Sequence, residues 1–174
     1  NAADPDRLEV RVGPNGYSYR ADAGPWVPGV EHVEALTVYG SAESDAPRRE
    51  ISVVGTAGAD LALEVRSFHS VTTVSLGGGD DSLFVGDFYG LDFDAAMGDG
   101  DDTVSVGTNF VPYGGGLLVD AGPGDDRITG SRGDDVILGR SGDDVLDGYQ
   151  GEDRVNGGAG RDTCSAETVI HCES

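Results

Sequence analysis

The sequence contains no lysine. All 11 basic residues among its 174 are arginines, against 32 Asp and Glu, so the formal net charge is -21. The absence of lysine excludes a Schiff-base lysine and the lysine that cradles phosphates in nucleotide-binding loops. Because like charges repel, the excess of acid also excludes a nucleic-acid backbone or an anionic membrane surface as the natural partner. Cations are the partners that such a composition favours.

Long apolar runs are also lacking. No stretch approaches the roughly 20 apolar residues that a membrane-spanning helix needs, and no signal-peptide core is present. We therefore predict no membrane insertion. His32 and His69 have no Ser or Cys partner in surroundings typical of a hydrolytic triad. No catalytic residue is predicted, and the chain is not expected to be an enzyme.

What the sequence does contain is a nine-residue phrase repeated five times without interruption. Its frame is GxxGxDxUx, where U is apolar, and the copies cover residues 121–129, 130–138, 139–147, 148–156 and 157–165. A fixed period this short is typical of a solenoid, in which each unit buries its apolar face only by stacking on the next. High acidity alone would also fit disorder, but a disordered tail has no reason to keep Asp in register with Val, Ile and Leu.

This frame resembles the calcium-binding nonapeptide repeats of the RTX family, whose consensus is GGxGxDxUx. The repeat at 157–165 matches every fixed position if Cys164 counts as the apolar residue, and the other four each lack one glycine. The resemblance implies a parallel β-roll in which Ca²⁺ ions lie between the turns of adjacent coils. In that family such rolls are commonly carried by exported toxins, adhesins, proteases and lipases, which implies a secreted, extracellular protein.

The Asp spacing extends the pattern toward the N-terminus. Asp60, Asp81 and Asp102 are 21 residues apart, Asp126 follows after 24, and the later Asp residues recur every nine. Two nonapeptides make an 18-residue coil, so a 21-residue coil is the same object with one enlarged turn. We therefore predict one continuous solenoid from about residue 35. One edge would carry Asp60, Asp81, Asp102, Asp126, Asp144 and Asp162. The other would carry Asp135 and Asp153 in the regular half, and loops at 41–50, 66–70, 86–90 and 107–116 in the early half.

Calcium prefers six to eight oxygen ligands, from carboxylates and backbone carbonyls. By the resemblance, several ions would be bound by the sixth-position Asp and the carbonyl of the second motif glycine. The predicted ligands are Asp60, Asp81, Asp102, Asp126, Asp135, Asp144, Asp153 and Asp162, with the carbonyls of Gly79, Gly100, Gly124, Gly133, Gly142, Gly151 and Gly160. The acids beside them (Asp80, Asp101, Asp125, Asp134, Asp143 and Glu152) are expected only to raise the local field. Arg161 replaces this acid in the last repeat and should weaken the terminal site.

The predicted fold is all-β: a right-handed parallel β-roll or β-helix solenoid forming one continuous, monomeric domain. Residues 1–34 would form an N-terminal hairpin cap, since strand-like alternation flanks a Pro14-Asn15-Gly16 turn. Residues 35–120 would form an irregular long-coil β-helix, 121–165 the regular nonapeptide roll and 166–174 a C-terminal cap.

The two cysteines lie eight residues apart, Cys164 at an inward position and Cys172 about half a coil later. A disulfide would fasten the last half-coil and indicates an oxidising compartment. The alternatives are two unpaired small apolar residues, or a zinc site that includes His171, for which only three ligands are available.

The expected function is that of a secreted calcium-binding module whose ions drive folding, in a structural, adhesive or export-folding role. One alternative is a calcium-dependent β-helical polysaccharide lyase, with Arg48, Arg49 and Arg66 as candidates for its base. The other is carbohydrate binding by aromatic residues that the coil spacing places in one column, although such rings more often serve packing. That column comprises Phe68, Phe88, Tyr89, Phe110 and Tyr113.

Overall fold

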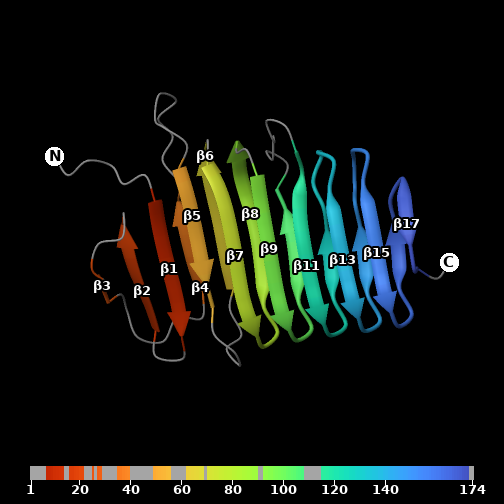
Figure 1. Ribbon diagram of the computed structural model, residues 1–174, viewed down its shortest axis with the longest axis horizontal. Helices are drawn as coiled ribbons and strands as arrows, with labels where there is room; N and C mark the ends of the chain where they lie inside the picture. The colour runs from red at the N-terminus through yellow and green to blue at the C-terminus, as the bar shows by residue number, and fades with distance from the viewer. Residues whose placement is uncertain are drawn as a thin grey trace.

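In the computed structural model the chain forms an elongated stack of β-strands (Figure 1). The structure describes residues 7–13, 16–21, 25, 27–28, 35–39, 49–55, 62–68, 70–89, 92–107 and 115–172. The strands are β1 (Arg7–Gly13), β2 (Gly16–Ala21), β3 (Val27–Pro28), β4 (Ala35–Tyr39), β5 (Arg49–Val54), β6 (Ala62–Phe68), β7 (Ser70–Gly78), β8 (Ser82–Tyr89), β9 (Asp92–Asp99), β10 (Thr103–Val106), β11 (Leu117–Pro123), β12 (Arg127–Thr129), β13 (Val136–Ser141), β14 (Val145–Asp147), β15 (Arg154–Ala159), β16 (Thr163–Ser165) and β17 (Thr168–Ile170).

These strands form two sheets, between which the chain alternates. The ten-stranded sheet has the order β17-β15-β13-β11-β9-β7-β5-β1-β2-β3, and the seven-stranded sheet has the order β16-β14-β12-β10-β8-β6-β4. From β4 onward every recorded pairing is parallel, each strand beside the next strand but one in the chain. This is a parallel β-solenoid, as the repeat spacing predicts.

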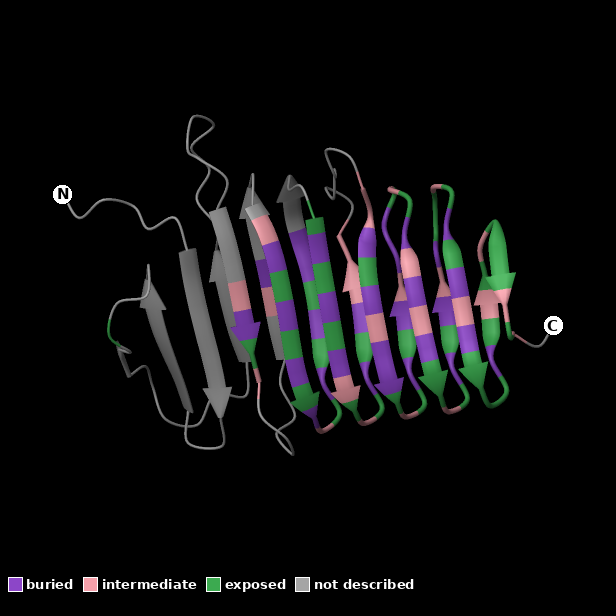
Figure 2. Cartoon of the chain, viewed as in Figure 1, coloured by how far each residue is buried: buried purple, intermediate pink, exposed green. Residues whose placement is uncertain are grey.

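The core lies between the two sheets. Burial alternates along the strands, because successive side chains of a strand point to opposite faces (Figure 2). Val119, Ile137 and Val155 are paired in register in the ten-stranded sheet, and all three are fully buried. Ile128 and Leu146 are paired in the opposite sheet and are almost fully buried. The apolar position of the first four repeats is therefore the position that the stack buries, and Cys164 in the fifth is partly buried.

At the N-terminal end, β1 and β2 pair antiparallel, with Leu8 opposite Ala21 and Gly13 opposite Gly16. β1 also pairs parallel with β5, so the antiparallel pair is joined directly to the ten-stranded sheet. The sequence predicts a hairpin here. Trp26 and the turn residues 14 and 15 lie outside the described residues.

Two predicted edge loops are strands instead. Residues 66–68 belong to β6 and residues 86–89 to β8, where loops were expected at 66–70 and 86–90. The pairing continues because the register shifts between Val65 and Ser67, after which Ser67 lies opposite Phe88 and Phe68 opposite Tyr89. The bulge places one extra residue of β8 within the sheet, so a coil can lengthen without enlarging its turn.

At the C-terminal end, Cys164 and Cys172 form a disulfide with a Cα–Cα distance of 5.9 Å. This confirms the predicted bond. The hypotheses of free cysteines and of a zinc site are wrong, because both sulfur atoms are consumed in the bond. Within the described part of the chain, no helix has the length and apolarity needed to cross a membrane.

Candidate metal centre

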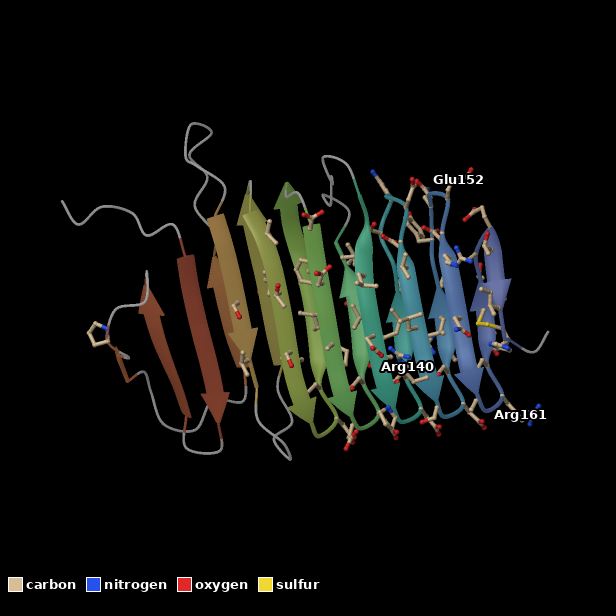
Figure 3. All side chains as sticks on the ribbon, in the orientation of Figure 1. Arg140, Glu152 and Arg161 are labelled. Carbon is tan, nitrogen blue, oxygen red and sulfur yellow. A yellow bond between two sulfur atoms is a disulfide. The ribbon has the colours of Figure 1, made fainter. Side chains whose placement is uncertain are left out.

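The Asp turns lie along two opposite edges of the stack. The turns that follow strands of the ten-stranded sheet form what we call the first edge. This edge carries Asp81, Asp102, Asp126, Asp144 and Asp162. The second edge contains the turns that follow strands of the seven-stranded sheet, and it carries Asp135 and Asp153. Figure 3 labels Arg161 on the first edge and Glu152 on the second, at opposite ends of the strands.

On the first edge the motif Asp residues form a hydrogen-bonded ladder from coil to coil. The Oδ1 atom of Asp102 accepts from the amide of Asp81 at 2.7 Å, and that of Asp126 from the amide of Asp102 at 2.8 Å. The same bond joins Asp126 to Asp144 at 2.9 Å, and Asp144 to Asp162 at 3.0 Å. All five residues are at most 2% exposed. The repeat therefore stacks these carboxylates inside the turns, one above another.

The second oxygen of these carboxylates has no protein partner at four of the turns. The Oδ2 atoms of Asp102, Asp126, Asp144 and Asp162 are buried and accept no hydrogen bond. A buried carboxylate oxygen without a partner carries a large desolvation penalty unless a cation or a proton compensates it. The first edge is thus a column of hard oxygen atoms that requires positive charge.

The acids beside the ladder form a second, exposed ladder. The amide of Asp101 donates to Oδ1 of Asp80 at 2.9 Å, that of Asp125 to Asp101 at 2.9 Å, and that of Asp143 to Asp125 at 2.8 Å. The amide of Arg161 ends this column on Asp143 at 2.9 Å. These bonds run in the opposite sense to those of the buried ladder. Sequence reasoning missed this role, although the regular occurrence of an acid at the fifth position was a signal for it.

The second edge differs from the first at its first regular turn. Both carboxylate oxygens of Asp135 are bonded: Oδ1 accepts from the amide of Leu117 at 2.7 Å and from the Ser131 hydroxyl at 2.8 Å, and Oδ2 from the amide of Ser131 at 2.5 Å. The Asp135 amide in turn donates to Oδ1 of Asp153 at 2.9 Å. Asp135 has the predicted position, but its oxygens are satisfied within the protein.

Six of the seven glycines predicted to lend a carbonyl have a positive φ, between 110° at Gly79 and 144° at Gly124; the others are Gly100, Gly142, Gly151 and Gly160. Gly133 is not among them, and it lies in the turn that Ser131 closes. At the preceding glycine position of the consensus, Arg140 and Tyr149 also adopt positive φ values, 82° and 75°. The turn keeps its conformation at these two positions although glycine has been replaced.

Calcium fits this donor set. No group of three or more His, Cys, Asp or Glu side chains among the described residues could hold a metal ion by itself. A metal bound here would need backbone carbonyls as well as the buried Asp oxygen, all of them hard donors. Calcium accepts such mixed oxygen ligands in flexible geometry, whereas zinc favours nitrogen and sulfur.

Burial changes the acidity of the ladder. Burial raises the pKa of the Asp126 carboxyl to about 7 and that of Asp102 to about 6, against an ordinary value of 3.8. It also raises the pKa of Asp144, where the neighbouring charge of Asp162 adds to the effect. A raised carboxyl pKa means that protons stabilise the metal-free fold below about pH 4, and that this stabilisation is lost as the pH rises through about 6 to 7. A cation bound at these oxygens would therefore compete with protons for them.

We accordingly expect acidification to weaken calcium binding. Between pH 7.5 and pH 5.5 the affinity at the first edge should fall by at least about tenfold, since a carboxyl of pKa 7 is mostly protonated at the lower pH. Calorimetric titration in two buffers of different ionisation enthalpy measures the affinity and the number of protons released. An affinity that is unchanged at pH 5.5, with no proton release, would contradict this competition.

Several predicted residues lie outside the description. Asp60, Arg48, Phe110 and Tyr113 are outside the described residues, and for Arg49, Arg66, Phe68, Phe88 and Tyr89 only the backbone is described. The prediction of an aromatic column and that of a lyase base therefore stay predictions.

Comparison with known families agrees with this geometry. Residues 120–154 and 129–164 match the model of the RTX calcium-binding nonapeptide repeat, which comprises four copies of the repeat. The chain thus carries RTX calcium-binding repeats, as their resemblance to the consensus indicates. Searches of curated proteins and of solved structures returned no match.

Proposed function

Because residues 120–164 carry RTX calcium-binding repeats in a β-solenoid, we propose that this chain is a secreted, non-enzymatic module whose fold is completed by several calcium ions. The observation that carries the proposal is the column of buried Oδ2 atoms without a protein partner on the first edge. A bound ion would compensate their charge at every coil. Calcium would then be a structural element of the stack.

The secreted setting is supported by two independent features. RTX repeats and a disulfide are both typical of exported proteins, since a disulfide persists in oxidising compartments. Calcium is abundant outside cells and scarce within them. A roll that requires calcium would remain unfolded before export and fold afterwards, which suits a structural, adhesive or export-folding role.

We further propose that the N-terminal antiparallel pair caps the stack. β2 and β3 follow β1 at the end of the ten-stranded sheet, where an uncovered parallel edge would invite pairing with another chain. We infer a right-handed coil, because crossovers between parallel strands are right-handed in about 98% of cases.

Substitution of a ladder carboxylate tests the proposal. Asp144→Asn keeps the shape of the side chain but removes the charge from a buried carboxylate, and we expect it to abolish at least one bound ion. Asp143→Asn is the matched control: both side chains accept a backbone hydrogen bond from an adjacent coil, at 2.9 Å for Asp143 and 2.9 Å for Asp144, but Asp143 is exposed. The control should keep the full stoichiometry and lose about threefold in affinity at most, as expected for an exposed charge.

Isothermal titration with calcium measures both quantities. Equal losses in the two variants would show that general negative charge, and not the buried ladder, holds the ions. A wild-type chain that binds no calcium at millimolar concentration would overturn the proposal altogether.

Carbohydrate binding is a second candidate, which rests on a different observation. A pocket of about 230 Å³ on the second edge is lined by Val106, Gly107, Thr129, Gly130, Ser131, Arg132 and Tyr149. Tyr149 is 53% exposed, and it lines the pocket together with Arg132, so an aromatic face and a hydrogen-bond donor are both available to a sugar ring. This pocket is separate from the predicted aromatic column.

A further inference from the structure

The last residues of the described chain make the same contacts as a regular half-coil, but the connection between the contacting residues is four residues shorter. In the regular coils, contacts recur at a separation of 18 residues, as in the bond from the Asp135 amide to Asp153. At the C-terminus the corresponding separation is 14, as in the bond from the Asp153 amide to Oε2 of Glu167 at 2.9 Å. Glu167 thus occupies the place in the second-edge ladder that an Asp of a further coil would take.

Three further contacts are each four residues shorter than their counterparts in the regular coils. The amide of Thr168 donates to the carbonyl of Asp153 at 3.0 Å, as Arg154 donates to Asp135 at 2.8 Å one coil earlier. β17 pairs with β15 in the register Arg154 with Thr168 and Asn156 with Ile170. The carbonyl of His171 lies 2.5 Å from the point where a Cβ on Gly157 would be, and the carbonyl of Gly157 lies 2.5 Å from the same point at Gly139. Residues 167–172 are therefore a shortened repeat that the consensus does not reveal.

The disulfide holds this shortened repeat in place. The turn that leads into β15 spans residues 148–153, whereas only Ala166 and Glu167 connect β16 to β17. Glu167 lies inside the loop closed by Cys164 and Cys172, and both cysteines pack against the core. The longer side chain of Glu, together with the cross-link, compensates for the residues that the turn lacks. The charge of Glu167 also faces Asp153, whose pKa is raised by burial and by this neighbour.

We propose that Glu167 is a positioning residue for calcium on the second edge and that the Cys164–Cys172 disulfide acts through it. Glu167 accepts a hydrogen bond from the amide of Asp153, and it thereby fixes the turn at 148–153, whose Asp153 and Gly151 are predicted calcium ligands. The inference rests on the proposed calcium function. It predicts that the disulfide and calcium binding are thermodynamically coupled. Breaking the bond weakens calcium binding at this edge, and calcium bound there makes the bond harder to reduce.

A double-mutant cycle in the full chain tests this coupling. The probe is terbium(III), a lanthanide that replaces calcium. Its luminescence, when sensitised by Tyr149 in the turn at 148–153, reports ions bound at the second edge. The Tyr149→Phe variant is the blank that gives the luminescence from other sites. Calcium affinity at the second edge is measured by displacement of terbium. We expect Glu167→Gln to lower the affinity about tenfold, within the usual range of coupling between sites. The matched control, Glu152→Gln, removes the same charge from the turn at 148–153. Both glutamates are exposed, but only Glu167 accepts the hydrogen bond from the Asp153 amide, so the control should change the affinity by less than about threefold.

Breaking the disulfide should have the same effect as Glu167→Gln. Dithiothreitol transfers two electrons and two protons to the bond, which yields two cysteine thiols and cyclic oxidised dithiothreitol; Cys164→Ser with Cys172→Ser reproduces the open state without a reductant. If the disulfide acts through Glu167, each change alone costs about tenfold and their combination about tenfold also, instead of a hundredfold.

Multiplicative losses, or a Glu167→Gln effect equal to that of Glu152→Gln, would overturn the inference. Since both outcomes presuppose that the wild-type chain binds calcium, they leave the proposed function standing. Loss of binding in the wild type would instead overturn the proposed function. Retention of the sheet signal in circular dichroism at saturating calcium shows which variants fold. If the serine variant does not fold, reduction of the disulfide in the wild-type chain provides the open state instead.

Discussion

Removal of calcium with excess EGTA at pH 7.5 is expected to unfold the regular repeats over residues 121–165. Without the ion, the buried Oδ2 atoms of Asp102, Asp126, Asp144 and Asp162 have neither a cation nor a hydrogen-bond donor. An uncompensated buried charge costs several kcal/mol. The combined penalty of such charges is of the same order as the roughly 5 to 15 kcal/mol by which a domain is usually stable. Folding and metal binding should therefore be one process.

Circular dichroism with and without chelator measures this. We expect the sheet signal to be lost in EGTA and to return when calcium is restored, with a midpoint that depends on calcium concentration. Magnesium is the control cation: it is smaller and demands near-ideal octahedral geometry, so it should restore little of the signal. A native-like sheet spectrum that persists in excess EGTA would contradict the coupling of folding to metal.

The stack and its edges could be predicted because they follow from periodicity. A strand buries alternate residues, so in-register Val, Ile and Leu define the core, and the Asp spacing of nine and 21 residues sorts the turns onto two edges. The alignment of Asp81, Asp102, Asp126, Asp144 and Asp162 along one edge follows from the same arithmetic. These features repeat from coil to coil, so the spacing of residues in the sequence reveals them.

The remaining features depart from the nine-residue period, and they therefore could not be predicted from the sequence. Glu167 lies 14 residues after its ladder neighbour and is not Asp, so no spacing rule identifies it. The Ser131 hydroxyl satisfies Asp135 through a bond that depends on the conformation of a single turn. The longer pairing of β6 with β8 depends on a bulge next to Val65. Each is a local solution to a change in coil length or turn composition, which only the three-dimensional packing of that turn determines.

Replacement of Gly142 by alanine is expected to destabilise the calcium-loaded roll by about 3 kcal/mol or more, which combines the strain of an unfavourable backbone conformation with a steric overlap. Gly142 has a φ of 136°, a conformation that residues with a Cβ rarely adopt. A Cβ there would also overlap the carbonyl oxygen of Gly124 in the coil below. Because coils stack at the strand spacing of about 4.8 Å, neither backbone can move away without breaking the Asp ladder on both sides.

Urea unfolding followed by circular dichroism in saturating calcium measures the loss, and Gly107→Ala is the matched control. Gly107 lies in the same stack, and the nearest atoms to a Cβ there, in Phe84 and Val85, are 3.4 Å away, which is ordinary van der Waals contact. The control should change the free energy of unfolding by less than about 1 kcal/mol, as for a substitution with no named defect. Since both variants add one methyl group in place of glycine, their difference gives the combined effect of the positive φ and of the close approach of stacked turns at Gly142. Equal stabilities would mean that the turns at Gly124 and Gly142 are not stacked as closely as this structure places them.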